Sequence, residues 1–309
     1  MNRRAFFGIG PALALLAACG KTSKIRFALN WKPEPEFGGF YAAPYSKYHL
    51  DVEILPGGAG TPTVQMVGAG SAEFGIVQAD EIVVARSNGN PVVGLFAVYQ
   101  HSPIGIMVHA ERNVNSIADV LKEGTLAVQK GLPFVRMLEK QYGLEHVQVV
   151  PSPGGDLTAF FADPNFAQQV FVTSEPLTAR KKGVAVKVFP VSDIGYDPYT
   201  NVLATSDDMV KKSPEIVKAM VAASEEGWRD YLDNPASANA KMNQLNPSMD
   251  METFAAVAEA QKPLIETEET RKDKLGTMNQ QRWETLIAQL KDLGDIPKTI
   301  PAQDCFRLF

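Results

Sequence analysis

The order of apolar runs along the chain limits its fold more than any other feature. Runs typical of strands alternate with runs typical of helices, and the turns between them are rich in glycine and proline. Before residue 100 the strand-like runs are 25–29, 51–55, 74–77 and 92–99, and the helix-like runs are 37–48, 62–67 and 80–87. This alternation predicts an α/β fold, with a parallel sheet covered by helices on both faces.

The alternation begins again after Val108, which predicts a second, smaller α/β unit. Its strand-like runs are 104–108, 125–129, 147–150, 170–172 and 184–189, and its helix-like runs are 116–124, 133–142, 156–162 and 176–182. From residue 209 onward only helices are expected, at about 214–232, 235–244, 251–265 and 279–292. A chain of 309 residues has room for two lobes of modest size.

An aromatic and acidic stretch, Asn30 to Tyr41, follows the first predicted strand. Open α/β sheets bind their ligands at the carboxyl ends of strands, so this position is informative. Two prolines exclude a regular helix or strand there. The remaining side chains include the rings Trp31, Phe37, Phe40 and Tyr41 and the carboxylates Glu34 and Glu36. The stretch predicts an aromatic clamp for a flat polar ligand. Taken alone, it fits a surface loop with rings covering the core equally well.

The amino terminus has the features of an export signal followed by a lipid tether. Arg3 and Arg4 precede a short apolar run that ends in small residues, which is typical of a secretory signal and too short for a spanning helix. The two arginines loosely resemble a twin-arginine export signal. Leu16-Ala17-Ala18-Cys19 resembles a bacterial lipobox, which implies cleavage and lipidation of Cys19. The alternative is an unmodified thiol. We predict a signal peptide at 1–18, a lipidated tether at 19–23, and a lipoprotein anchored in the periplasm or at the cell surface.

Cysteine, histidine and charge content exclude several classes of protein. Besides Cys19 the chain holds one cysteine, Cys305, so lipidation of Cys19 leaves no disulfide framework. The four histidines are scattered, and no Cys/His spacing fits a zinc site, so no metal is expected. The net charge is −5, and removing Arg3 and Arg4 with the signal gives 28 − 35 = −7. This balance argues against a nucleic-acid partner.

Several short stretches match one family of exported binding proteins in their order and spacing. They are Leu29-Asn30-Trp31-x-Pro33, Gly39-x-Tyr41-x-Ala43, Pro56-Gly57-Gly58, Gly68-x-Gly70-x-Ala72-Glu73-Phe74-Gly75-Ile76, Ala79-Asp80-Glu81, Gln100-x-Ser102-Pro103-x-Gly105 and Thr173-x-Glu175-Pro176. From Lys24 to about Leu293 the chain resembles the substrate-binding proteins of ABC importers. The resemblance is closest to the branch that binds thiamine pyrimidine precursors.

The resemblance implies a periplasmic-binding-protein fold of type II-like form. Its two lobes would be joined by crossover strands near 104–109 and 201–205 and would close over a ligand. Lobe 1 would comprise 24–105 and 203–309, and lobe 2 would comprise 106–202. The implied function is capture of a small planar heterocycle, most of all a thiamine pyrimidine precursor, for an inner-membrane ABC permease. A monomer without a cofactor is expected.

Three rival functions stay open beside this one. Within binding proteins, a riboflavin-like ring or an aromatic sulfonate is the nearest rival ligand. Of another class is the family's pyrimidine-synthesising enzyme, which uses pyridoxal phosphate and iron and carries a cysteine-rich cluster. This chain has no such cluster after Cys19, so no catalytic residue is assigned. The third rival is a sensor lobe that signals rather than transports.

Two residues carry the predicted ligand site. Trp31 ends the first strand, where the resemblance implies stacking on a ligand ring; core packing is the alternative. Glu175 lies between a strand and Pro176, where its carboxylate can accept two hydrogen bonds from an aminopyrimidine edge. The alternative for Glu175 is a charge placed at a helix start.

The other predicted contacts are weaker, because each has an equally simple structural role. Phe37 and Tyr41 belong to the aromatic stretch and can be core, and the two glycines can form a tight turn. The aspartate can cap a helix, and the remaining residues flank the crossovers. The full set of predicted additional contacts is Asn30, Phe37, Tyr41, Gly57, Gly58, Asp80, Gln100, His101 and Tyr199.

Overall fold

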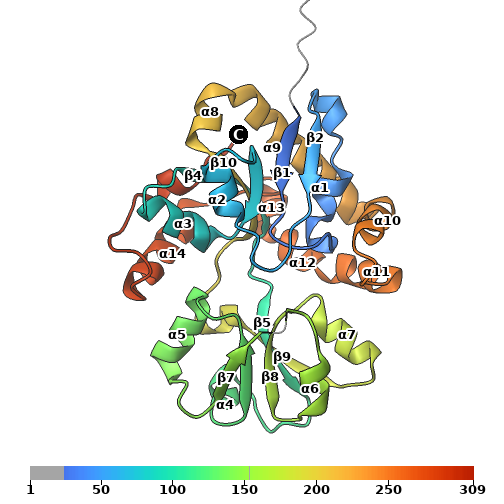
Figure 1. Ribbon diagram of the computed structural model, residues 1–309, viewed down its shortest axis with the longest axis vertical. Coiled ribbons are helices and arrows are strands. Elements are labelled where there is room, and N and C mark those ends of the chain that lie inside the picture. The colour runs from blue at the N-terminus through green and yellow to red at the C-terminus, as the bar shows by residue number, and fades with distance from the viewer. Residues whose placement is uncertain (1–23, 153) are drawn as a thin grey trace, which may run out of the picture.

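The computed structural model describes residues 24–152 and 154–309, which form two lobes, drawn one above the other in Figure 1. Each lobe is built on a five-stranded sheet. The predicted two-lobed α/β fold is therefore confirmed. The predicted signal peptide, the tether and Cys19 lie outside the described residues.

The sheet of lobe 1 has the strand order β2-β1-β3-β10-β4. Its strands are β1 (Ile25–Ala28), β2 (Val52–Leu55), β3 (Phe74–Val77), β4 (Val92–Tyr99) and β10 (Thr200–Ser206). Strand β1 is parallel to β2 and β3, whereas β10 is antiparallel to β3 and β4. The sheet is mixed rather than parallel as predicted, because β10 enters it on the chain's return from lobe 2.

The first predicted helix of lobe 1 is divided into shorter pieces, whereas the next two lie within one residue of their predicted bounds. The helices are η1 (Pro35–Phe37), α1 (Gly38–Ala42), η2 (Tyr45–Tyr48), α2 (Thr63–Gly68) and α3 (Ala79–Ser87). The helix predicted over 37–48 is broken at Pro44, because a proline forces the residue before it into an extended conformation. Helix α2 begins one residue later than predicted, since Pro62 occupies its N-cap.

The sheet of lobe 2 has the strand order β7-β6-β8-β5-β9. Its strands are β5 (Ile104–His109), β6 (Thr125–Val128), β7 (Gln148–Pro151), β8 (Phe166–Phe171) and β9 (Val186–Pro190). Its helices are α4 (Ile117–Val120), α5 (Pro133–Tyr142), α6 (Thr158–Ala162), α7 (Glu175–Lys181) and η3 (Val191–Ile194). Strand β8 begins four residues before the predicted run at 170. Two polar glutamines at its centre made this strand hard to recognise in the sequence. One of them, Gln168, is fully buried and donates a hydrogen bond to the Asp156 carbonyl.

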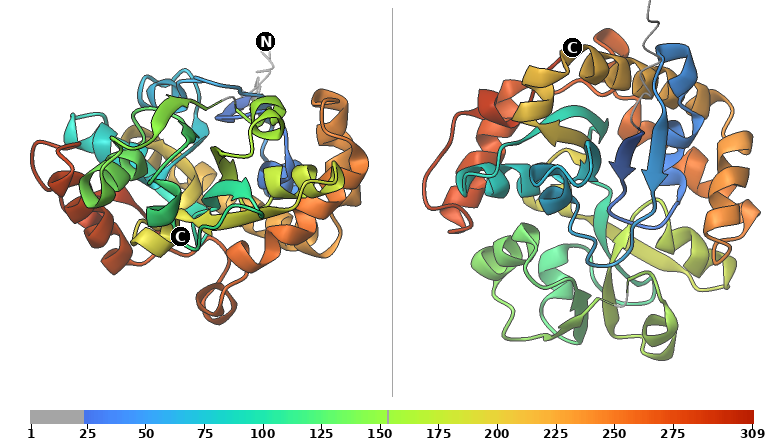
Figure 2. Two further views of the ribbon diagram at one scale, coloured as in Figure 1. Left: turned by 90° about the horizontal axis from the view of Figure 1, so that it is seen from below. Right: turned by 45° about the horizontal axis from the view of Figure 1, so that its top comes forward.

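The carboxyl-terminal third is helical, as predicted. Its helices are α8 (Asp207–Lys212), α9 (Pro214–Asp233), α10 (Ala236–Leu245), α11 (Met251–Ala260), α12 (Lys262–Ile265), α13 (Glu268–Lys272), α14 (Gln280–Asp292) and α15 (Ala302–Cys305). They gather around the sheet of lobe 1, shown in orange and red in Figure 2. No helix among the described residues is long and apolar enough to cross a membrane.

Helix α1 packs closely on α9, and this contact fixes the aromatic stretch from behind. The Phe40 ring lies edge-on to Phe27 and Trp228, with ring centroids 5.1 Å and 5.7 Å apart. The backbones approach at Gly39 and Gly227, where a Cβ added to Gly227 would lie 2.2 Å from the Gly39 carbonyl oxygen. The helix that follows the aromatic stretch is thereby held against the core of lobe 1.

Two short segments, 100–103 and 195–199, connect the lobes. They are tied together by Asp197, which accepts hydrogen bonds at 2.7 Å from the Ser102 N–H and from His101 Nδ1. The segments predicted as crossovers, 104–109 and 201–205, lie in β5 and β10, and each of these strands belongs to one sheet. The connections therefore fall a few residues before the predicted positions.

Candidate functional site

Trp31 follows β1 in lobe 1 and faces a loop of lobe 2. A methyl group added at Gly154 would lie 3.5 Å from Cη2 of the Trp31 ring. The ring is half-buried, and the Lys32 Nζ lies 6.0 Å from its centroid. The indole is thus placed at the junction of the lobes by the end of the first strand.

Glu175 reaches the same junction from lobe 2, as the first residue of α7. The Phe171 N–H donates to its Oε2 at 2.9 Å, which fixes the carboxylate at the end of β8. A methyl group added at Gly155 would lie 3.5 Å from its other oxygen, Oε1. Burial raises the pKa of Glu175 to about 7, and the negative charge of Glu34 adds to the effect. One loop of lobe 2 therefore adjoins both Trp31 and Glu175.

Glu34 and Glu36 add two more partly buried carboxylates from the aromatic stretch. Burial raises the pKa of Glu36 well above its ordinary value, and the charges of Glu34 and Glu175 raise it further. Burial also raises the pKa of Glu34, against a hydrogen bond at 3.2 Å from Asn246 Nδ2 to its Oε1. We call Glu34, Glu36 and Glu175 together the acidic junction.

Among the described residues no cation is paired with the acidic junction, although the positive charge of Lys32 acts against the raised pKa of Glu34. Across residues 24–152 and 154–309, no ion pair within 4.0 Å involves any of its three carboxylates. In the same residues no group of three or more His, Cys, Asp or Glu side chains is arranged to hold a metal ion. Partly buried carboxylates without cations are costly unless a ligand supplies hydrogen-bond donors or positive charge. The junction thus suits a donor-rich or cationic ligand.

A buried hydrogen-bond network supports the aromatic stretch at Pro35, between its two glutamates. The Tyr99 hydroxyl donates to Gln261 Oε1 at 2.7 Å, and Gln261 Nε2 donates to the Pro35 carbonyl at 2.9 Å. The Tyr99 ring also lies edge-on to Phe171 of lobe 2, with centroids 6.4 Å apart. Sequence reasoning missed Gln261, because nothing in the turn between α11 and α12, 226 residues further along, indicates a contact with Pro35.

Comparison with known proteins adds a family to this geometry. The family model described as NMT1/THI5 like matches residues 34–238. The chain belongs to this family. The match begins at Glu34 of the acidic junction and includes Glu175.

Three relatives have named activities. The chain is 23% identical to the formylaminopyrimidine-binding protein of Halalkalibacterium halodurans over 96% of this chain and 95% of that one. It is 24% identical to the riboflavin-binding protein RibY of Chloroflexus aurantiacus, covering 96% and 90% of the two chains. It is 19% identical to the 4-amino-5-hydroxymethyl-2-methylpyrimidine phosphate synthase of Legionella pneumophila, covering 76% and 77%.

Among solved structures, the fold matches the periplasmic aliphatic sulphonate binding protein SsuA of Escherichia coli. The TM-score is 0.68 at 15% identity, and the match covers 91% of both chains. At this identity the likeness supports the shared fold.

Among the other predicted contacts, several lie in packing away from the acidic junction. Phe37 is fully buried in the core of lobe 1, because the turn of η1 points it inward. Asp80 is buried and accepts a hydrogen bond at 2.8 Å from the Tyr196 hydroxyl. Tyr199 lies under the Arg282 guanidinium, 3.9 Å from its ring centroid, and its hydroxyl accepts from the Asn279 N–H. The structure thus places all three in lobe 1 packing.

Contacts outside the acidic junction are also made by Gln100, His101 and Tyr41. Gln100 is buried, and its Nε2 donates to the carbonyls of Ala97 and Thr277. His101 is exposed and pairs with Asp197 between the connecting segments. Tyr41 lies in α1, which contacts α9, α10 and η1, and its hydroxyl is buried without a hydrogen-bond partner among the described residues. The predicted role of these three residues as ligand contacts therefore stays a prediction.

Asn30 and the glycine turn lie beside Trp31. The Gly57 N–H donates to the Trp31 carbonyl at 3.0 Å, and an added Cβ at Gly57 would lie 2.1 Å from the Leu29 carbonyl oxygen. The Gly58 N–H is used within the turn, donating to Thr61 Oγ1. The Asn30 Oδ1 is buried without a hydrogen-bond partner among the described residues. Asn30 thus stays a candidate contact, while the glycines serve the turn.

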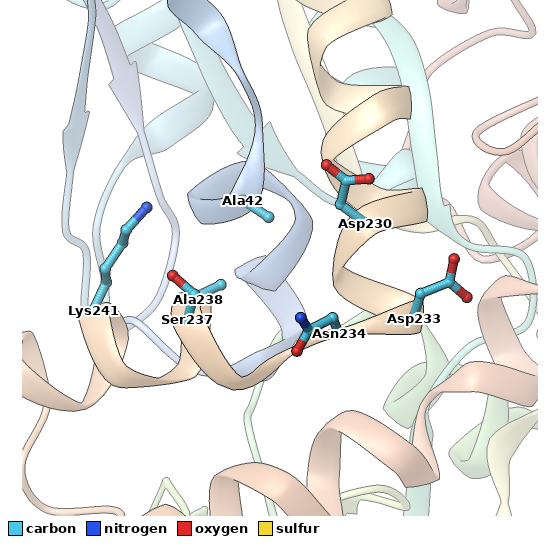
Figure 3. A pocket seen from close by; sticks show the side chains of 7 residues that line it. All are labelled: Ala42, Asp230, Asp233, Asn234, Ser237, Ala238 and Lys241. Atoms are coloured by element: carbon cyan, nitrogen blue, oxygen red, sulfur yellow. The ribbon is translucent and has the colours of Figure 1, made fainter.

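A surface pocket lies elsewhere on lobe 1, between α1, the end of α9 and α10 (Figure 3). The residues that line it are Ala42, Asp230, Asp233, Asn234, Ser237, Ala238 and Lys241. None of them belongs to the acidic junction or to the predicted set of contacts. This pocket is therefore separate from the candidate site.

Proposed function

We propose that this chain is the solute-binding component of an ABC importer and captures a small planar heterocycle with N–H donors on its edge. A thiamine pyrimidine precursor is the first choice. The observation that carries the proposal is the acidic junction beside Trp31, contributed by both lobes. An indole offers a ring face, and carboxylates accept from amino groups, so the two together fit an aminopyrimidine.

Electrostatics separate the candidate ligands. An aromatic or aliphatic sulfonate carries a fixed negative charge and has no N–H donor for the three carboxyl groups, whose ionised forms would repel it. Riboflavin has an N–H donor on its pyrimidine edge, so it remains the second candidate. An aminopyrimidine is smaller and presents more donors per ring.

A pyrimidine-synthesising enzyme is the alternative of another class, favoured by the named relative of Legionella pneumophila. We propose binding rather than synthesis, with no catalytic residue and no cofactor. The described cysteine, Cys305, is fully buried in α15 and takes no part in the candidate site. Lobe closure around the ligand would then present a bound form to the permease.

Calorimetry and mass spectrometry test this proposal together. The mature protein is purified, its co-purified small molecules are identified by mass spectrometry, and its absorbance is scanned for a pyridoxal band. Binding is then measured for 4-amino-5-hydroxymethyl-2-methylpyrimidine, riboflavin and an alkanesulfonate. We expect the aminopyrimidine to bind most tightly and the sulfonate not to bind. Preferential sulfonate binding, or a pyridoxal band with turnover, would contradict the proposal.

A further inference from the structure

Asn201 has an unusual backbone conformation near the start of β10, just after the connecting segment 195–199. Its φ angle is +52°, in the left-handed region, and its side chain is fully buried within β10. The ladder between β10 and β4 pairs Thr200 with Tyr99 and Val202 with Ala97, and it skips Asn201. Non-glycine residues in this conformation are uncommon, and asparagine is among the few that tolerate it. Such a residue inside a strand points to a local function.

The contacts of Asn201 join three segments that are distant in the sequence. Its N–H donates to Gln78 Oε1 at 3.1 Å, at the start of α3, and Gln78 Nε2 lies 3.5 Å from its Oδ1. Its Nδ2 donates to the Glu36 backbone carbonyl at 3.4 Å. Asn201 itself follows the segment 195–199 that returns from lobe 2. One side chain thus links the acidic stretch, α3 and the interlobe connection.

We propose that Asn201 is a positioning residue of the ligand site: it fixes the backbone of Glu36 and thereby places the Glu36 carboxylate at the acidic junction. The proposal rests on the proposed function for the ligand that the site takes. Asn201 is fully buried, so it acts through Glu36 rather than by touching the ligand. Because of the left-handed backbone, the Asn201 N–H donates to Gln78 rather than to a neighbouring strand. The backbone and the side-chain amide of Asn201 together therefore link Gln78 to Glu36.

The variant Asn201→Gly separates positioning from folding. Glycine adopts a φ of +52° without strain, whereas the amide that holds Glu36 is lost. We expect the melting temperature to stay near the wild-type value, while affinity for 4-amino-5-hydroxymethyl-2-methylpyrimidine falls at least fivefold. Asn201→Asp tolerates the same backbone and adds a fourth carboxylate, so it should weaken binding further as the pH rises. A parallel loss of stability and affinity in both variants would indicate a purely structural residue and overturn the proposal.

His49 provides a matched control. It is the other non-glycine residue with a left-handed backbone among the described residues, with a φ of +57°, and it is exposed at the end of η2. His49→Gly makes the same backbone change away from the acidic junction. It should leave affinity unchanged, and an equal loss of affinity in His49→Gly would contradict the assignment to Asn201.

Hydrogen exchange without ligand distinguishes failure of this inference from failure of the proposed function. In Asn201→Gly, amides of 34–39 should exchange faster than in the wild type, whereas those of β6 and β7 should not change. If the wild-type protein binds no aminopyrimidine, the proposed function fails, and the exchange of 34–39 still decides the role of Asn201. Unchanged exchange in 34–39 would overturn the positioning role.

Discussion

At the scale of single residues, Trp31 and Glu175 approach the ligand from opposite lobes. We predict that Trp31→Ala and Glu175→Gln each weaken aminopyrimidine binding by about tenfold or more. Stacking contributes roughly 0.5–1.5 kcal/mol beyond area burial, a hydrogen bond to a charged group about 1.5–3 kcal/mol, and about 1.4 kcal/mol is tenfold. Both side chains are only partly buried, so neither variant should unfold. Calorimetry decides this, and unchanged affinity in both variants would leave the site unlocated.

The pKa of Glu175 gives a second prediction, on stability against pH. Burial raises this pKa from 4.5 to about 7, so the folded state holds the proton more tightly than the unfolded chain. The stability that protonated Glu175 contributes is therefore complete below pH 4.5 and is lost as pH rises to about 7. Relative to Glu175→Gln, the ligand-free wild type should lose about 1–3 kcal/mol between these values. Denaturant unfolding at a series of pH values measures it, and parallel curves for the two proteins would contradict it.

At the scale of elements, the crossing of α1 and α9 supports the aromatic stretch. An added Cβ at Gly227 would lie 2.2 Å from the Gly39 carbonyl oxygen and 2.5 Å from the Ala43 Cα. Because these are backbone atoms, they cannot rotate away. We predict that Gly227→Ala destabilises the protein by about 1–3 kcal/mol, as overpacked cores do. The control is Gly58→Ala, whose added Cβ meets nothing within 4 Å and should change stability by less than about 0.5 kcal/mol. Equal melting temperatures would show that the helices can separate freely.

The elements also show what could be read from the sequence. The four strands of lobe 1 before residue 100 were predicted within one residue, because each is a short apolar run bounded by turn residues, whereas β10 was predicted as a crossover. For the site, the sequence places Trp31 and Glu175 after strand ends, and the structure brings both to the junction of the lobes. The sequence does not show that Phe37 is buried, because the phase of a single 3-10 turn decides whether its ring points in or out. The roles of Gln261 and Asn201 depend on tertiary contacts that no local pattern contains. The asparagine inside a strand was the one available signal.

At the scale of the whole molecule, the proposed lipid tether determines where the protein works. Cys19→Ser should release the exported protein from membranes into the soluble fraction, because a lipid chain is then absent. Fractionation of cells that express the two forms measures this. A matched variant, Cys305→Ser, changes the buried thiol of α15 and should leave the partition unchanged. If Cys19→Ser still partitions with membranes, the anchor lies elsewhere.

Ion pairs join the two lobes at two places that differ in burial, and they provide a test of lobe closure. Arg136 of α5 lies 2.5 Å from Asp295 after α14, and the Asp295 side chain is 9% exposed. Lys181 of α7 lies 2.7 Å from Glu252 of α11, whose side chain is 81% exposed. Exposed pairs contribute about 0–1 kcal/mol, whereas a buried group left without its partner costs about 1–3 kcal/mol or more.

Arg136→Ala should therefore favour the open form, and Lys181→Ala should not. Removing Arg136 leaves Asp295 near the buried Asp80, whose pKa is raised by burial first and in part by the charge of Asp295. Asp80 and Asp295 both belong to lobe 1, so they stay together in the open and the closed form. With the lobes in contact, Asp295 is then buried without the cation that Arg136 supplied, and opening the lobes lets water reach its carboxylate. We expect the ligand-free radius of gyration from X-ray scattering to increase in Arg136→Ala, and a larger decrease when saturating aminopyrimidine closes the lobes. Lys181→Ala, matched in charge, should scatter like the wild type. Equal opening in both variants would mean that net charge, rather than the buried pair, sets the balance between open and closed lobes.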